Sequence, residues 1–203
     1  MTSHFTLYIS AANDMEAERD LLARAVVALP VDLTWRIELS PRANDPVDQQ
    51  AIAQAALHLL LLGSDIRAPI GLEWLVARRY GRSPVPLLQE GVSRTMAAED
   101  FRRFIERQAE WRSFAGHAQL RQHVQRLLGR MILDRTAAYG LSADEVVQLQ
   151  NWLEAIDEAP GPDQEPLGGA GDSSLIFSKE RYEPSSGVLL RPGKADDKAE
   201  SSP

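Results

Sequence analysis

The sequence predicts an α/β fold in which a parallel β-sheet is flanked by helices. Four short apolar segments, at residues 5–10, 33–39, 57–62 and 84–88, have the length and composition of strands, and amphipathic segments separate them. Such alternation is typical of a parallel sheet with right-handed crossovers. The chain has 203 residues, of which 44% are hydrophobic, which is enough to form the packed core of one such domain.

The first strand runs directly into a helix. Phe5, Leu7 and Ile9 alternate with less apolar neighbours, which is the two-residue period of a strand whose faces differ. Asn13 is a good helix cap, and Glu16 follows it three positions later as in a capping box. We therefore expect a helix that begins at Asn13 and continues to about residue 29.

The following elements carry start and stop signals of their own. Asp45 and Pro46 predict a helix that runs to about residue 56, because Asp caps helices and Pro fits the first helical position. Segment 57–62 is apolar apart from His58 and does not alternate, as expected of a central strand buried on both faces. Segment 84–88 should lie nearer an edge, because its prolines cannot donate to a ladder. We expect a flavodoxin-like strand order, with the first strand between the second and third.

A further helix is predicted over residues 71–80, between the third and fourth strands, with Gly81 as its C-cap. The apolar residues of this helix recur at helical spacing, so we expect them to form one side that faces the sheet. They are Leu72, Leu75, Val76 and Tyr80.

The second half of the chain is predicted to be almost wholly helical up to residue 157, with helices at 96–114, 118–139 and 142–157. Ser142 and Glu145 form a capping box for the last of these helices. We therefore divide the chain into an α/β domain over residues 1–140, a helical extension over 141–158, and a final part over 159–203. That part comprises a Gly/Pro-rich linker, a possible hairpin of residues 174–178 and 187–190, and a disordered tail from residue 191.

The composition of the chain argues against nucleic-acid binding, membrane insertion and metal binding. The formal net charge is −7, which makes nucleic acid an improbable partner, although the Arg-rich stretch 102–135 can form a local positive face. No segment reaches the roughly 18 to 20 apolar residues of a membrane span. The chain lacks cysteine, has no secretory signal pattern, and is expected to be cytoplasmic. No histidine has metal-site spacing, and His58, inside a predicted strand, is expected to be a hydrogen-bonded core residue.

Candidate site residues gather where the strands are expected to end. Ligands bind at the carboxyl ends of the strands in open parallel sheets. Glu73 lies in the first turn of its predicted helix, and a carboxylate there can hold a ribose hydroxyl or act on an oxocarbenium-like centre. It can also simply complement the helix dipole. The ligand-binding residues that we expect to border Glu73 are Ser10, Asn13, Asp14, Ser64, Asp65 and Gly71.

The segment from Tyr8 to Asp20, Y-I-S-A-A-N-D-M-E-A-E-R-D, resembles the opening I-S-S-T-F-x-D-x-x-x-E-R-D of a TIR-like domain family of unknown function. Domains of that family often precede NTPase or repeat modules in bacterial signalling and conflict proteins. The segment that begins at Glu73 resembles a later motif of the family. It is also similar to the matching segment of TIR-domain NAD hydrolases and nucleoside 2-deoxyribosyltransferases, in which the helix glutamate is catalytic. Ala11 and Ala12 depart from the family's hydroxyl and aromatic residues.

Two functions follow from these observations. The first is a TIR-like signalling or defence module that acts through contacts with a protein partner or with itself. The alternative is an enzyme that cleaves an N-glycosidic bond, with Glu73 as the catalytic carboxylate and NAD or a nucleoside as substrate. No bound cofactor is expected in either case.

Overall fold

The computed structural model describes residues 4–41, 45–158 and 175–177. Its centre is a sheet in which every recorded strand pair is parallel, in the order β5-β4-β3-β1-β2-β6. The expected fold class is confirmed, and β1 lies between β2 and β3 as the flavodoxin-like order requires. The strands are β1 (His4–Ala11), β2 (Thr34–Leu39), β3 (Leu57–Leu62), β4 (Val85–Gln89), β5 (Arg112–Phe114) and β6 (Leu175–Phe177).

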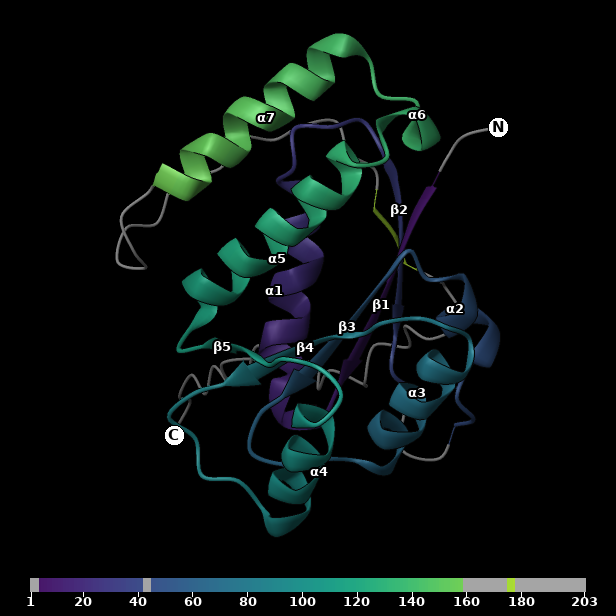
Figure 1. Cartoon of the computed structure of the whole chain (residues 1–203), viewed down its shortest axis with the longest axis vertical. Helices are drawn as coiled ribbons and strands as arrows, with labels where there is room; N and C mark the ends of the chain where they lie inside the picture. The colour runs from purple at the N-terminus through teal and green to yellow at the C-terminus, as the bar shows by residue number, and fades with distance from the viewer. Residues whose placement is uncertain (1–3, 42–44, 159–174, 178–203) are drawn as a thin grey trace, which may run out of the picture.

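Helices cover both faces of this sheet (Figure 1). On one face α1 packs against α5, and α7 forms an outer layer on α5. On the other face lie α2, α3 and α4. The helices are α1 (Glu16–Val27), α2 (Gln49–Gln54), α3 (Ala68–Arg79), α4 (Met96–Glu106), α5 (His117–Leu133), α6 (Thr136–Tyr139) and α7 (Ala143–Glu158).

The period-two pattern of β1 decides which side chains face which helices. Phe5, Leu7 and Ile9 are completely buried in the core beneath α1 and α5. Tyr8, on the opposite side of the strand, packs with α2 and α3. Because Tyr8 and Ser10 are polar but buried, this second face must provide hydrogen-bond partners for them.

The helical prediction for residues 96–114 was wrong in its second half. The helix ends at Glu106, and Arg112–Phe114 form β5 on the open edge beside β4. The Trp111 indole nitrogen donates to the carbonyl oxygen of Arg102 at 3.0 Å, which fixes the turn between helix and strand. The expected helix 118–139 is likewise divided into α5 and the short α6.

Two helix starts differ from the prediction, and one agrees with it. Asp48, and not Asp45, caps α2, because its carboxylate accepts from the amide of Ala51 at 2.9 Å. Asn13 does not cap α1; it begins a single 3₁₀ turn, and α1 starts at Glu16. The capping box of Ser142 with Glu145 is confirmed, with reciprocal bonds of 2.8 and 3.3 Å.

The predicted apolar side of α3 was wrong for three of its four residues. Of the four, only Val76 is buried, and it packs with α2. Leu72, Leu75 and Tyr80 are 51, 55 and 49% exposed. The stripe that faces the sheet instead recurs at i, i+3, i+4 and i+7, and it consists of Ile70, Glu73, Trp74 and Ala77. The sheet side of α3 therefore buries a carboxylate, and its outer side carries two leucines in contact with solvent.

The final part of the chain adds one strand to the sheet. Residues 175–177 pair in parallel with Trp35–Ile37 of β2, where we had expected one arm of a hairpin. The other expected arm, at 187–190, and the tail from 191 lie outside the described residues. None of the described helices combines the length and apolarity that a membrane span requires.

Candidate functional site

Glu73 lies at the centre of a buried polar cluster between α3, β1 and the end of β2. Its side chain is completely inaccessible to solvent. The Tyr8 hydroxyl donates to Glu73 Oε1 at 2.7 Å, and the Ser40 hydroxyl donates to Glu73 Oε2 at 2.8 Å. Hydrogen bonds to a carboxylate are stronger than those between neutral groups, and they offset part of the cost of burying the charge.

Ser40 fixes this carboxylate relative to the sheet. It directly follows β2, and its amide donates to the carbonyl of Ile9 at 3.0 Å, which continues the β1–β2 pairing. Its hydroxyl oxygen also accepts from the amide of Ala11 at 3.2 Å. Our sequence reasoning missed both Tyr8 and Ser40 as partners of Glu73. The available signal was their placement: Tyr8 is on the polar side of β1, and Ser40 follows a strand at the sheet's carboxyl edge.

Ser10 and His58 form a second buried pair on the same face. The Ser10 hydroxyl lies 2.7 Å from His58 Nε2, and the two residues are 0 and 3% exposed. Burial lowers the pKa of His58 from 6.5 to about 3, so its imidazole is neutral near pH 7. The His58 ring meets the ring of Tyr8 edge-on, with centroids 5.0 Å apart. The prediction of a hydrogen-bonded core histidine is confirmed.

Asp14 organises a third group, in which two loops at the sheet edge are joined. Its Oδ2 accepts from the Ser64 amide at 2.7 Å, from the Ser64 hydroxyl at 2.8 Å and from the Asp65 amide at 3.2 Å. A Cβ atom on Gly63 would lie 2.7 Å from the same oxygen and would collide with Met15. The loop after β3 therefore needs glycine at position 63 in order to approach Asp14 so closely.

Asp65 extends this junction to the start of α4. Its Oδ1 accepts from the Thr95 hydroxyl and from the Ile66 amide, both at 2.8 Å. The hydrogen bond from Thr95, followed by that from Ile66, lowers the pKa of Asp65. The amide of Thr95 in turn donates to the carbonyl of Ser64 at 2.9 Å. These bonds engage the carboxylates of both Asp14 and Asp65 within the protein.

The expected site residues are thus distributed over three groups. Asp14, Ser64 and Asp65 lie together at the loop junction, whereas Ser10 is bonded to His58 inside the sheet. Within the described part of the chain, no hydrogen bond connects Glu73 to the Asp14 junction. Asn13 is exposed in the 3₁₀ turn. Gly71 has room for a side chain, since a Cβ there would meet only Phe101, at 3.9 Å.

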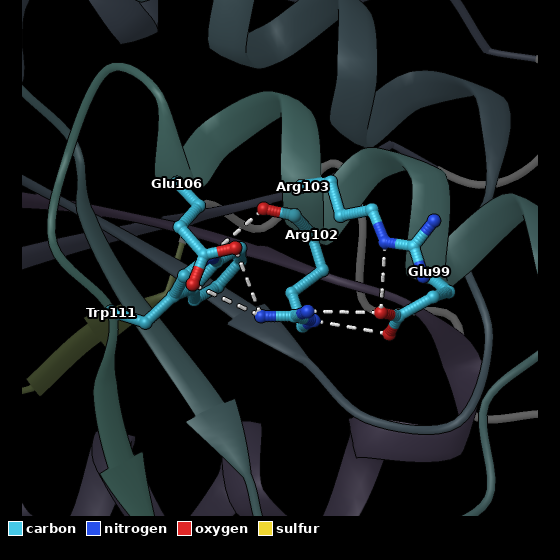
Figure 2. A network of polar contacts seen from close by, with 5 residues as sticks. All are labelled: Glu99, Arg102, Arg103, Glu106 and Trp111. Carbon is cyan, nitrogen blue, oxygen red and sulfur yellow. Dashed lines mark hydrogen bonds and ion pairs between the residues drawn. The ribbon is translucent and has the colours of Figure 1, made fainter.

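Half of the arginines in the Arg-rich stretch are paired with acidic residues: Arg102, Arg103, Arg126 and Arg130. Figure 2 shows the Arg102 guanidinium between Glu99 and Glu106, at 2.9 and 3.1 Å. Hydrogen bonding to Glu99 raises the pKa of Arg102. Farther along, Arg126 and Arg130 both pair with Asp157 on α7.

A shallow, open depression of about 420 Å³ adjoins the Arg102 network, between the end of α4 and strands β4 and β5. It lies on the β4–β5 side of the sheet, whereas Glu73 contacts β1 and the residue after β2. Its lining combines paired charges with one aromatic ring: Leu88, Arg102, Glu106, Ala109, Glu110, Trp111 and Ser113.

Among the described residues, no three His, Cys, Asp or Glu side chains are grouped so that they could hold a metal ion.

Comparison with known proteins adds no functional residue to the site. No protein-family model matches the chain, and none of the curated proteins matches it.

Proposed function

We propose that this chain is a TIR-like signalling module, of the kind used in bacterial signalling or defence, that acts through protein–protein contacts. The observation that carries the proposal is the outer face of α3. Leu72 and Leu75 are each about half exposed there. They lie three positions apart, so they share one side of the helix. Arg78 and Arg79, both exposed, follow in the last turn.

Apolar side chains of this kind cost free energy when they remain in water. Burying one leucine side chain contributes about 1.5–3 kcal/mol. Grouped apolar residues with a charged rim are typical of surfaces that bind another protein. We therefore assign the partner-binding surface to the outer side of α3, defined by Leu72, Leu75, Arg78 and Arg79, and we call it the α3 surface.

The burial and the hydrogen bonds of Glu73 support a structural role for this residue. A carboxylate that stabilises or attacks a sugar centre must touch the sugar. Glu73 is completely buried, and both of its oxygens already accept hydrogen bonds from Tyr8 and Ser40. In this proposal the carboxylate joins α3 to β1 and β2 and thereby holds the α3 surface in place.

The alternative function is hydrolysis or transfer at an N-glycosidic bond of NAD or a nucleoside, with Glu73 as the catalytic group. One observation favours it: two hydroxyl groups fix the carboxylate near the carboxyl end of β2, the region where ligands bind in open parallel sheets. This function requires the cluster to open before the sugar can reach Glu73.

A paired experiment distinguishes the two functions. A photo-crosslinking amino acid at position 75 is expected to form a covalent adduct with another polypeptide chain. The same group at exposed Ala17 on α1 serves as the control and should give none. The purified chain is also incubated with NAD and with a nucleoside mixture, in parallel with Glu73→Gln. Turnover that Glu73→Gln abolishes would refute the proposal in favour of the alternative, and so would the absence of any adduct specific to position 75.

A further inference from the structure

We propose that the depression between the end of α4 and strands β4 and β5 binds an arginine side chain of a basic partner protein. The depression and the α3 surface share no residue, so this second site does not depend on the proposed function. Three features of the described residues carry the inference: an aromatic ring that is held in place, a carboxylate without a partner, and an excess of negative charge.

The side chain of Trp111 forms an aromatic wall of the depression, and two contacts hold it there. Its indole nitrogen donates to the carbonyl oxygen of Arg102 at 3.0 Å, as Figure 2 shows. The side chain also packs against the apolar cluster that contains Trp74 and Ile105, and it remains partly exposed where it lines the depression. An indole ring is the best aromatic acceptor for a cation, and a planar guanidinium can also stack on it. The fixed ring therefore offers a platform for an arginine.

The depression contains one carboxylate that is already paired and one that is not. Both oxygens of Glu106 accept hydrogen bonds from Nη1 of Arg102, at 3.2 and 3.1 Å. Within the described part of the chain, the Glu110 carboxylate has neither a hydrogen bond nor an ion pair. A guanidinium can donate two parallel hydrogen bonds to one carboxylate. Glu110 can therefore pair with an incoming arginine without the loss of an existing contact.

Charge favours a cation in the depression and a basic protein around it. Among the described residues of the lining, Arg102 is positive and Glu106 and Glu110 are negative, which leaves one negative charge in excess. Alternate residues of a strand point to opposite faces, so Arg112 points away from the face on which Ser113 lines the depression. The whole chain has a formal net charge of −7, which attracts a basic partner and repels a second copy.

The shape of the depression indicates what carries the arginine. A pocket for a free small molecule buries most of the surface of its ligand. This depression of about 420 Å³ is shallow and open, with Leu88 and Ala109 as the apolar part of its lining. A long side chain that enters from outside can use this space, while the polypeptide that carries it rests on the rim. We therefore commit to a polypeptide as the source of the guanidinium group.

The first test uses the full chain and follows the indole N–H signal of Trp111 by NMR, which the spectrum of Trp111→Phe assigns. The probe is a short peptide that has one arginine between glycines and capped ends. The signal should shift progressively as this peptide is added. The same peptide with citrulline in place of arginine keeps the shape of the side chain and loses its charge, so it should bind about fivefold more weakly.

The second test removes the unpaired carboxylate. Glu110→Gln keeps the size of an exposed side chain and should weaken binding of the arginine peptide about two- to fivefold. Glu90→Gln is the matched control at an exposed position outside the lining, and it should bind the peptide as the wild type does. Added salt should weaken binding to the wild type more than binding to Glu110→Gln, because salt screens the charge that the variant lacks.

An indole signal that does not move overturns the inference, and so does equal binding of the arginine and citrulline peptides. Equal affinities of wild type and Glu110→Gln also overturn it, because the site then makes no use of the unpaired carboxylate. Free arginine amide tests the source of the cation: it should bind more weakly than the peptide, and an equal affinity refutes a polypeptide as the carrier. None of these measurements involves position 75, so the failure of this site and the failure of the proposed function are distinguishable.

Discussion

Replacing Tyr8 with Phe is the most direct test of the buried cluster around Glu73. The substitution keeps the ring, which is completely buried and packs edge-on against His58, and it removes only the hydroxyl. The lost bond is a 2.7 Å hydrogen bond to a carboxylate. Hydrogen bonds to charged groups contribute about 1.5–3 kcal/mol, and here the acceptor stays buried after its donor is gone.

We expect Tyr8→Phe to lower the free energy of unfolding by about 2 kcal/mol. For a chain of this length that corresponds to a decrease in Tm of about 4–8 °C. Urea denaturation followed by circular dichroism measures the change in free energy, and a thermal scan measures Tm. Tyr80→Phe is the matched control, because Tyr80 is 49% exposed and its hydroxyl can bond to water.

The reasoning is refuted if Tyr8→Phe and Tyr80→Phe differ by less than about 0.5 kcal/mol, the usual range for a surface substitution. A double-mutant cycle with Ser40→Ala, which removes the donor to the other oxygen, then measures how far the two hydroxyls act together on Glu73.

Three other predictions address separate features. Gly63→Ala should destabilise the chain by about 1–3 kcal/mol, because the added Cβ collides with the Asp14 junction. Gly71→Ala has room for its Cβ and should be neutral or stabilising by up to about 1 kcal/mol. Chemical denaturation measures both changes. His58 stays neutral in the folded chain down to its pKa of about 3, whereas in the unfolded chain it binds a proton below pH 6.5, so acid favours unfolding. About 2 kcal/mol of unfolding free energy should therefore be lost between pH 6.5 and pH 5. A His58→Gln variant whose unfolding free energy falls equally steeply over this pH range would contradict the prediction. Glu145→Ala should cost about 1 kcal/mol of unfolding free energy. Hydrogen bonds, of which the one from the amide of Asp32 is the strongest, lower the pKa of Glu145, so its stabilising effect is present above pH 4.5 and is lost as the pH falls below it. The variant should lack this pH dependence, and equal pH profiles of stability for variant and wild type would refute the prediction.

Much of the fold could be predicted from local patterns. Alternation in β1, continuous burial in β3 and the apolar stripe of α1 each follow from one element in contact with one core. The stripe of Met15, Leu22 and Val26 is completely buried. Strand β5 was missed because three residues, Arg112–Phe114, are too few to show a period, and pairing with β4 decides their conformation.

The candidate site was harder to predict, because its contacts join positions that are far apart in the sequence. Glu73 is 65 positions from Tyr8 and 33 from Ser40. On α3 the leucines gave the stronger apolar signal, but the sheet face opposite that helix presents the Tyr8 hydroxyl, so the sheet side of α3 carries a carboxylate. Periodicity alone does not show which of two possible sides of a helix faces a hydrogen-bond partner on the sheet.

The position of β1 in the sheet has a consequence for how the protein is made. The central strand comes first in the chain; β2 is added on one flank, then β3, β4 and β5 on the other, and β6 last. Asp14 and Ser64 are 50 positions apart, so at about 5–20 residues per second a ribosome needs roughly 2.5–10 s to deliver the second after the first. Within that interval β2 is completed first, and until β3 follows, β1 can pair with β2 alone; a two-stranded unit is marginal in water. A sheet of three strands, which can be stable on its own, is therefore possible only after β3 has left the ribosome.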